Sequence, residues 1–293
     1  MSGMDSDRIT REYFDSMLLE ARYWDSDLPS TELTLYGETF ATPIMTAALS
    51  HLDKVCPGGA VKMAREAKEA GAIHWTGMGG EEELEAILAT GARTVKIIKP
   101  HEDDRIIFEK IGHACRHGAF AVGMDIDHAF NGKGGYDHVL GLPMHSKTSA
   151  QLREYVRASE RPFLVKGVLS ARDAEKCVEA GVRGLVVSHH HGIMPDAVPP
   201  LMILPEIVKA VDHQIPVFVD CGFESGLDVF KALALGADAV SVGRHLMGFL
   251  AGEEGAVAAR IREMTGELKS LMARTGAGSL KEIDPSVIHF RRF

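Results

Sequence analysis

The stretch VEAGVRGLVVSHH at residues 178–190 and the stretch LALGADAVSVG at residues 233–243 decide the fold. In each, a helical pattern ends at a glycine, Gly181 or Gly236, because glycine adopts the left-handed conformation that closes a helix. An apolar run without polar alternation follows, which is typical of a parallel strand buried on both faces. Each stretch therefore predicts a helix that leads into a buried strand.

Three other stretches repeat this junction: KEAGAIHW at 68–75, LATGARTVKII at 88–98 and CRHGAFAVGMDI at 115–126. With the remaining apolar runs they complete a set of eight predicted strands, at 42–49, 73–76, 94–99, 119–126, 163–168, 184–190, 216–222 and 239–243. Eight predicted helices alternate with them, at 59–70, 81–90, 104–117, 149–160, 171–180, 203–212, 226–235 and 255–274.

This alternation predicts an α/β fold, a single-domain (β/α)8 TIM barrel. A doubly wound open sheet is the less favoured alternative, because no GxGxxG sequence follows the first predicted strand. Residues 42–293 would form the barrel, and residues 1–41 an N-terminal extension that packs across one end of it. The hydroxyls of Ser149 and Ser170 are expected to cap the helices that begin there.

The composition, 45% hydrophobic and 25% charged, is that of a globular protein. A net charge of -9 argues against nucleic acid or an anionic membrane as a partner. The polar amino terminus has no signal-peptide pattern and no segment has the length of a transmembrane helix, so we expect a cytoplasmic location. None of the four cysteines forms a CxxC pair, which argues against a zinc ribbon or a disulfide framework.

Two long connections, residues 127–148 and 191–202, follow the fourth and sixth predicted strands. Loops at the carboxyl ends of barrel strands carry binding and catalytic residues. Polar side chains also gather at these strand ends, which predicts a site there; they are Thr76, Lys96, Asp125, Lys166, Ser188, His189, His190, Asp220 and Arg244.

The histidine triplet and a lysine are the most informative of these residues. Side chains alternate along a strand, so His189 and His191 are expected to point one way and His190 the other. A histidine beside a carboxylate is a general base near neutral pH, whereas the structural alternative is a core histidine bound by the backbone. Lys166 lies within the apolar sequence VKGV and needs an anionic partner, either a ligand or a neighbouring carboxylate.

Glycine-rich turns end the last two predicted strands, at VDCGFESG and SVGRHL. Barrels commonly bind phosphate at these two turns, where Gly222, Gly226 and Gly243 permit close approach and Arg244 supplies hydrogen-bond donors.

The histidines and aspartates near these strand ends are possible metal ligands; they are Asp125, Asp127, His128, His145, His189, His190 and His191. Consecutive histidines do not match the common zinc spacings, so the sequence assigns no metal ligands.

At these residues the chain resembles the FMN-dependent α-hydroxy-acid oxidase and dehydrogenase family, which includes glycolate oxidase and lactate oxidase. The resemblance runs from about Thr42 to Ile283 and is densest from Pro162 to Gly243. The segments that carry it are FLVKGVLSARDAEKCVEAGVRGLVVS, LPEIVKAV and GLDVFKALALGADAVSVGR.

The resemblance implies an FMN cofactor over the mouth of the barrel. Lys166 would contact the flavin and stabilise its reduced form, His190 would be the catalytic base, and Asp125 would orient it. The resemblance also assigns cofactor contacts to Ala47, Ala48, Thr76, Lys96, Lys166, Ser188, Asp220, Gly222, Gly243 and Arg244.

The chain departs from the family pattern where the substrate carboxylate and the phosphate are bound. The family's SNHGGRQLD becomes SHHHGIMPD, so that Ile193 replaces the arginine that clamps the substrate. Ile98 replaces a substrate-contacting tyrosine, and Glu224 replaces a phosphate-binding arginine. No arginine corresponds to the family's loop arginine within residues 131–137.

The sequence therefore predicts an FMN-dependent oxidoreductase that acts on the CH–OH group of a small, non-standard substrate, with His189, His191 and Ile193 at the substrate. By resemblance it would be a homo-oligomer, a tetramer. The first alternative is a flavin-free lyase, isomerase or hydrolase for a phosphorylated substrate, with or without a metal held by the histidines. The second is a non-catalytic ligand-binding barrel.

Overall fold

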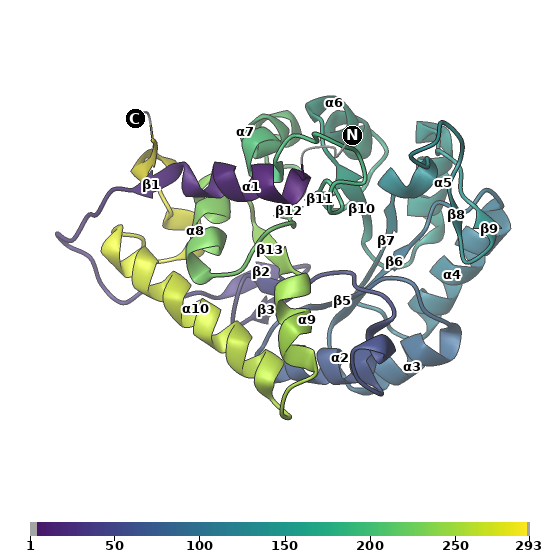
Figure 1. Cartoon of the computed structure of the whole chain (residues 1–293), viewed down its shortest axis with the longest axis horizontal. Coiled ribbons are helices and arrows are strands. Elements are labelled where there is room, and N and C mark those ends of the chain that lie inside the picture. Colours follow the sequence, from purple (N-terminus) through teal and green to yellow (C-terminus); the bar gives the residue numbers. More distant parts are fainter. Residues whose placement is uncertain (1–4, 292–293) are drawn as a thin grey trace.

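Eight parallel strands form the centre of the computed structural model, which describes residues 5–291 (Figure 1). The strands are β4 (Ile44–Thr46), β5 (His74–Thr76), β6 (Thr94–Ile98), β7 (Ala121–Asp125), β10 (Phe163–Val168), β11 (Leu185–Val187), β12 (Val217–Val219) and β13 (Ala239–Val242). They are ordered β4-β13-β12-β11-β10-β7-β6-β5. The Thr46 amide donates a 3.1 Å hydrogen bond to the Ile73 carbonyl, and Leu49 forms a bridge with Thr76. These contacts join β4 to β5, the two ends of this order, and close the barrel. The predicted TIM barrel is confirmed.

Helices cover the outside of the barrel at the predicted positions. They are α2 (Gly59–Glu69), α3 (Glu81–Ala89), α4 (Asp104–Arg116), α5 (Ser149–Ala158), α6 (Ala171–Glu179), α7 (Pro200–Val211), α8 (Gly226–Ala234) and α10 (Ala256–Arg274), with the short α9 (Arg244–Leu250) before α10. Ser170 caps α6 as predicted. The cap of α5 is Thr148 rather than Ser149, because Thr148 and Gln151 form a reciprocal capping box.

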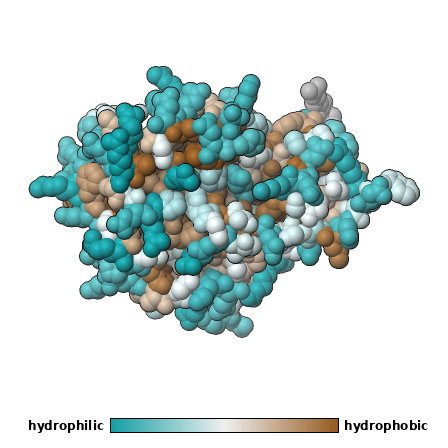
Figure 2. Space-filling model, turned by 180° about the vertical axis from the view of Figure 1, so that it is seen from behind, coloured by the Kyte–Doolittle hydropathy of each residue, from teal (hydrophilic) through white to brown (hydrophobic). Residues whose placement is uncertain are grey.

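Two layers of apolar packing hold the barrel together. Inside it, Trp75 meets Phe218 edge-to-face with ring centroids 5.8 Å apart. Outside it, the buried sides of the strands pack against the helices, with Val187 and Leu204 among the residues that are fully buried. Figure 2 shows the rear face, where hydrophilic residues predominate and hydrophobic residues lie between them. Within residues 5–291, no helix has the length and apolar character needed to cross a membrane.

Residues 5–41 contact both ends of the barrel, whereas the sequence suggested one. Helix α1 (Ser6–Asp15) lies at the carboxyl-terminal end, beside α7 in Figure 1, and its Phe14 packs edge-to-face on Phe223. The hairpin of β2 (Leu33–Leu35) and β3 (Glu38–Phe40) covers the amino-terminal end, where Tyr36 donates a hydrogen bond to the Arg183 carbonyl. The short strand β1 (Met17–Leu19) pairs with β14 (Ile288–Phe290) near the end of the chain.

His74 makes the stability of the barrel depend on pH. It is 1% exposed, its Nδ1 lies 3.0 Å from Thr46 Oγ1, and burial lowers its pKa from 6.5 to about 3. Below pH 6.5 the unfolded chain takes up a proton that the folded chain does not, so acid favours unfolding. Between pH 6.5 and 5 this group alone should cost about 2 kcal/mol of unfolding free energy. Denaturant titrations should show a shallower pH dependence for His74→Gln, and equal slopes would contradict the assignment.

Candidate active site

Lys166 lies at the carboxyl-terminal end of the barrel, in β10, and is 5% exposed. Its Nζ lies 3.5 Å from Oδ1 of Asp125 and 3.3 Å from Oδ2 of Asp220. It also donates a 3.2 Å hydrogen bond to Ser188 Oγ. Burial by itself lowers the pKa of a lysine, but the two carboxylates outweigh it and raise the pKa of Lys166. Lys166 is therefore a fixed positive charge.

Asp125 is the last residue of β7 and is 2% exposed. Lys99, which follows β6, lies 2.6 Å from its Oδ2. Burial would raise the pKa of Asp125, yet the charges of Lys166 and Lys99 hold it below its ordinary range. Asp125 is thus a permanent carboxylate that neutralises two lysines, and it is a poor proton acceptor.

His190 follows β11 and has the geometry of a general base. Its Nδ1 lies 3.1 Å and 3.2 Å from the two carboxylate oxygens of Asp127. Lys166 Nζ lies 3.4 Å from the same Nδ1. The closer carboxylate, which only accepts hydrogen bonds, assigns the proton to Nδ1, so Nε2 keeps its lone pair. The Asp127 contact therefore fixes the tautomer in which Nε2 can accept a proton from a substrate.

Asp127, not Asp125, is the carboxylate that hydrogen-bonds this histidine. The resemblance gave that role to Asp125, whose Oδ1 lies 3.9 Å from His190 Nδ1. Asp127 opens a short 3₁₀ turn directly after β7, two residues beyond Asp125. Sequence reasoning named Asp127 only as a possible metal ligand, although its place at the start of a long loop was a usable signal.

The three histidines diverge because β11 ends at Val187, before any of them. His189 is 2% exposed, and its Nε2 lies 2.8 Å from Thr10 Oγ1 on α1, so it is held by the N-terminal helix. His191 faces a cavity at the mouth of the barrel, and its Nδ1 lies 3.9 Å from Asp7 Oδ1. Ile193 is 37% exposed on the same loop. The substrate roles predicted for these residues stay predictions.

The loop after β11 stores backbone strain. His190 and His191 have φ angles of 47° and 57°, a left-handed conformation that costs a residue with a side chain about 1–2 kcal/mol. Gly192 adopts the same region, with φ 71°, at no such cost. Replacing His191 by glycine should therefore raise the free energy of unfolding by about 1 kcal/mol. His191→Ala is the matched control, because it removes the imidazole and keeps the strain; equal stability of both variants would refute the strain.

A cavity of about 410 Å³ lies beside these groups. Its lining combines strand ends β4, β12 and β13 with α1, through Asp7, Arg11, Ala47, His191, Asp220, Cys221, Gly222, Phe223, Glu224, Ser241, Gly243, Arg244 and His245. The Ser241 hydroxyl oxygen is buried with no hydrogen-bond partner among the described residues. A Cβ on Gly243 would lie 3.3 Å from the Ala47 Cβ, so a side chain there would crowd the cavity.

Helix α1 brings two charges to this cavity that sequence reasoning missed. Asp7 accepts a 2.7 Å hydrogen bond from Arg244, and Arg11 donates a 2.8 Å hydrogen bond to Asp228. Glu224 lies exposed at the rim. No sequence signal joins residue 7 to residue 244, because only the packing of α1 on the barrel brings them together.

Five of the predicted cofactor residues line the cavity: Ala47, Asp220, Gly222, Gly243 and Arg244. Lys166 and Ser188 form the charged cluster next to it, through Asp220. The other three belong to the first strands of the barrel: Ala48 follows β4, Thr76 ends β5, and Lys96 is in the middle of β6. Lys96 is buried and donates a hydrogen bond to the Gly77 carbonyl, and burial lowers its pKa to about 8.

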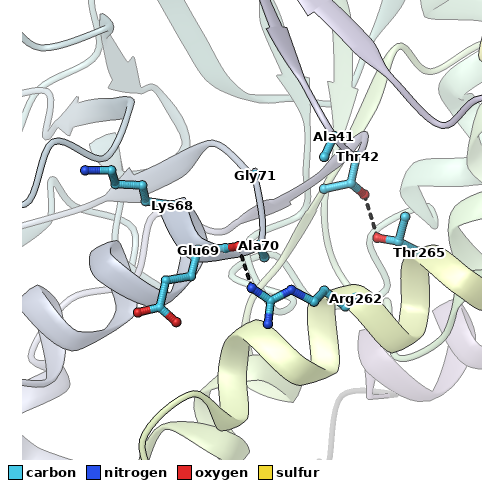
Figure 3. Close-up of a pocket in the computed structure, with 8 residues that line it drawn as sticks. All are labelled: Ala41, Thr42, Lys68, Glu69, Ala70, Gly71, Arg262 and Thr265. Carbon is cyan, nitrogen blue, oxygen red and sulfur yellow. Dashed lines mark hydrogen bonds between the residues drawn. The ribbon is translucent and has the colours of Figure 1, made fainter.

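A second cavity, of about 420 Å³, lies at the opposite end of the barrel. Figure 3 shows its lining from α2, α10 and the segment before β4. Arg262 donates to the Glu69 carbonyl, and Thr42 and Thr265 bond to each other at 2.8 Å. These groups are paired among themselves and include no histidine–carboxylate pair, so we place the active site at the other end.

Comparison with known proteins identifies relatives of this chain. A family model described as FMN-dependent dehydrogenase matches residues 3–160 and 145–290. The chain is 32% identical to glycolate oxidase of Spinacia oleracea, over 87% of this chain and 79% of the relative. It is 31% identical to 4-hydroxymandelate oxidase of Amycolatopsis orientalis, over 86% and 80%.

Solved structures of mandelate oxidase have the same fold as this chain. A mandelate oxidase variant with a monooxide FMN adduct superposes with a TM-score of 0.88 at 27% identity, covering 99% of this chain and 92% of that chain. Mandelate oxidase with (S)-2-phenylpropionate also gives a TM-score of 0.88 at 27% identity, over 98% and 90%.

Proposed function

Because the chain belongs to the FMN-dependent dehydrogenase family, we propose that it is an FMN-dependent oxidoreductase that oxidises the CH–OH group of a small hydroxylated substrate. The observation that carries the proposal is the pairing of His190 with Asp127, 3.1 Å apart, beside the buried cation Lys166. A flavin-free barrel, the first alternative, is not favoured by this family membership.

The residues around the cavity at the mouth of the barrel fit FMN. Its volume lies within the range of ordinary ligand sites. The Ser241 hydroxyl is buried without a hydrogen-bond partner among the described residues. Gly222 and Gly243, which have no side chain, let a cofactor approach the backbone closely. Arg244 would hold the anionic end, and Ala47 and Asp220 would line the remainder. When bound there, FMN supplies a ring that accepts two electrons from the substrate.

The chain's own groups provide the acid–base part of the reaction. Nε2 of His190 takes the proton released when the substrate is oxidised, and Asp127 stabilises the imidazolium that results. Lys166 keeps a positive charge near the reacting atoms, because Asp125 and Asp220 hold it protonated. Asp125 acts through Lys166 and Lys99 as a positioning residue.

We propose further that the substrate is not a simple 2-hydroxy acid. The family position for the carboxylate clamp holds Ile193, which has no hydrogen-bond donor in its side chain. Lys166, whose Nζ lies 3.4 Å from His190 Nδ1, is paired with Asp125, as is Lys99. A carboxylate substrate thus lacks its bidentate partner. Assembly as a homo-oligomer stays a prediction from resemblance.

An absorbance spectrum of the purified full chain tests the proposal first. We expect flavin absorbance, either as purified or after incubation with FMN and removal of the excess. Under anaerobic conditions, hydroxylated substrates without a carboxylate should bleach it faster than glycolate, L-lactate or mandelate. A folded chain that stays colourless after incubation with FMN would overturn the flavin assignment; fast bleaching by a simple 2-hydroxy acid would overturn the substrate assignment alone.

Arg244 offers a test of the cofactor position. A charge-assisted hydrogen bond contributes about 1.5–3 kcal/mol, so Arg244→Gln should weaken FMN binding roughly 10–100-fold, measured by quenching of flavin fluorescence. Arg262→Gln, the same change at the cavity in Figure 3, is the matched control and should leave the FMN dissociation constant unchanged. Equal affinities in wild type and Arg244→Gln would place the anionic end elsewhere.

A further inference from the structure

Two histidine–carboxylate pairs face each other at the mouth of the barrel. His190 lies against Asp127 through Nδ1, and His128 lies 3.4 Å from Asp137 Oδ2 through its own Nδ1. The two Nε2 atoms are 3.2 Å apart, and the rings meet edge-to-face. The residues come from two loops that are about sixty positions apart in sequence, so the sequence alone does not pair them.

The protonation of these rings brings two nitrogen lone pairs into contact. The closest hydrogen-bond partner of each Nδ1 is a carboxylate, at 3.1 Å for His190 and 3.4 Å for His128. A carboxylate only accepts, so we assign a proton to each Nδ1. Both Nε2 atoms then present lone pairs to each other at 3.2 Å. Two lone pairs at this distance repel unless a cation lies between them.

The charges nearby favour a divalent cation. The site is surrounded by four carboxylates and two ammonium groups; they are Asp125, Asp127, Asp137, Asp220, Lys99 and Lys166. These groups carry a net charge of −2. One divalent ion would neutralise it, whereas a single proton would neutralise only half.

The distances also match a metal site. Two nitrogen ligands at about 2.0–2.1 Å from a tetrahedral ion lie about 3.3 Å from each other, close to the 3.2 Å found here. Ligand atoms of Asp127, His128 and His190 all lie within 4.8 Å of one another. A carboxylate on the second nitrogen of each ring is the usual support of a metal-binding histidine. The side chains of His128 and His190 are 21% and 24% exposed, so an ion can enter from solvent.

We propose that Nε2 of His128 and Nε2 of His190 bind one divalent transition metal ion, for which zinc is the best match in donor type and geometry. Water completes the coordination. Asp127 and Asp137 hold the two rings in place. Metal binding does not depend on FMN, but it occupies the lone pair that the proposed oxidation uses, so a bound ion would inhibit that reaction.

Equilibrium dialysis of the full chain against zinc tests the site. A second cluster, Glu85, His113 and His117, lies between α3 and α4 and is disabled in His117→Gln. The His117→Gln chain, freed of metal with a chelator, should bind one zinc ion. Adding His128→Gln should weaken that binding at least tenfold, and adding Asp137→Asn should weaken it roughly 10–100-fold.

Cobalt supplies an independent readout. Co²⁺ should give the intense visible bands of tetrahedral coordination in the His117→Gln chain and lose them when His128→Gln is added. The proposal is overturned if the His117→Gln chain binds no zinc, or if its affinity is unchanged by both His128→Gln and Asp137→Asn. These readouts need no substrate, so their failure is distinct from failure of the proposed oxidation.

Discussion

Replacing His190 by glutamine is expected to lower the rate of substrate oxidation by about 10²–10⁴-fold, the usual contribution of a general base. Glutamine keeps the polarity and approximate size of the side chain but has no nitrogen lone pair that accepts the proton. The measurement is the anaerobic rate of flavin bleaching by the most rapidly oxidised substrate. Binding of FMN should change little, because His190 does not line the cavity assigned to it.

Two further variants test whether the loss of rate comes from the missing base. His138→Gln makes the same change at an exposed position of β8 (His138–Val139), in the loop after β7, and should leave the bleaching rate at the wild-type value. Asp127→Asn keeps the base but loses the carboxylate that fixes its tautomer, so its rate should fall between those of wild type and His190→Gln. A His190→Gln chain that bleaches within threefold of wild type would exclude His190 as the base.

The barrel could be predicted because its signals are local. A glycine that ends a helix and an apolar run that follows it, as at Gly181 and Leu185–Val187, are read within a dozen residues. The strand ends were less predictable: the apolar pattern extended the sixth strand to His190, whereas β11 stops at Val187. The left-handed backbone at His190 and His191 is incompatible with a strand, and sequence pattern does not show it.

Only part of the site could be predicted, because only some of its residues give a local signal in the sequence. Lys166 and His190 stand out because a charged or polar side chain next to an apolar strand is unusual. Partners from distant loops give no such signal: Asp127 and His128 reach His190 through the path of the long loop, and Asp7 reaches Arg244 through the packing of α1. Such contacts depend on tertiary structure alone.

Lys166→Met should lower the free energy of unfolding by about 3–5 kcal/mol, the usual cost of removing one partner from a buried ion pair. Methionine preserves most of the volume, so the loss reports charge rather than a cavity. Asp125 keeps Lys99 at 2.6 Å, but within residues 5–291 Asp220 keeps hydrogen bonds only to neutral groups, such as the thiol of Cys221. The unpaired carboxylate of Asp220 is therefore the main source of the loss, which denaturant titration of the FMN-free chain measures.

If the unpaired carboxylate of Asp220 causes the loss, a second substitution in the same cluster should reverse part of it. Adding Asp220→Asn to Lys166→Met removes the unpaired charge and should recover part of the stability, so the double variant should be more stable than Lys166→Met alone. Lys176→Met is the surface control: Lys176 pairs with Asp173 at 2.9 Å, both side chains are 46% exposed, and such pairs contribute at most about 1 kcal/mol. If Lys166→Met costs no more than Lys176→Met, then Lys166 is not the charge that holds Asp125 and Asp220 in the barrel. In that case its proposed role beside the flavin would lose its electrostatic basis as well.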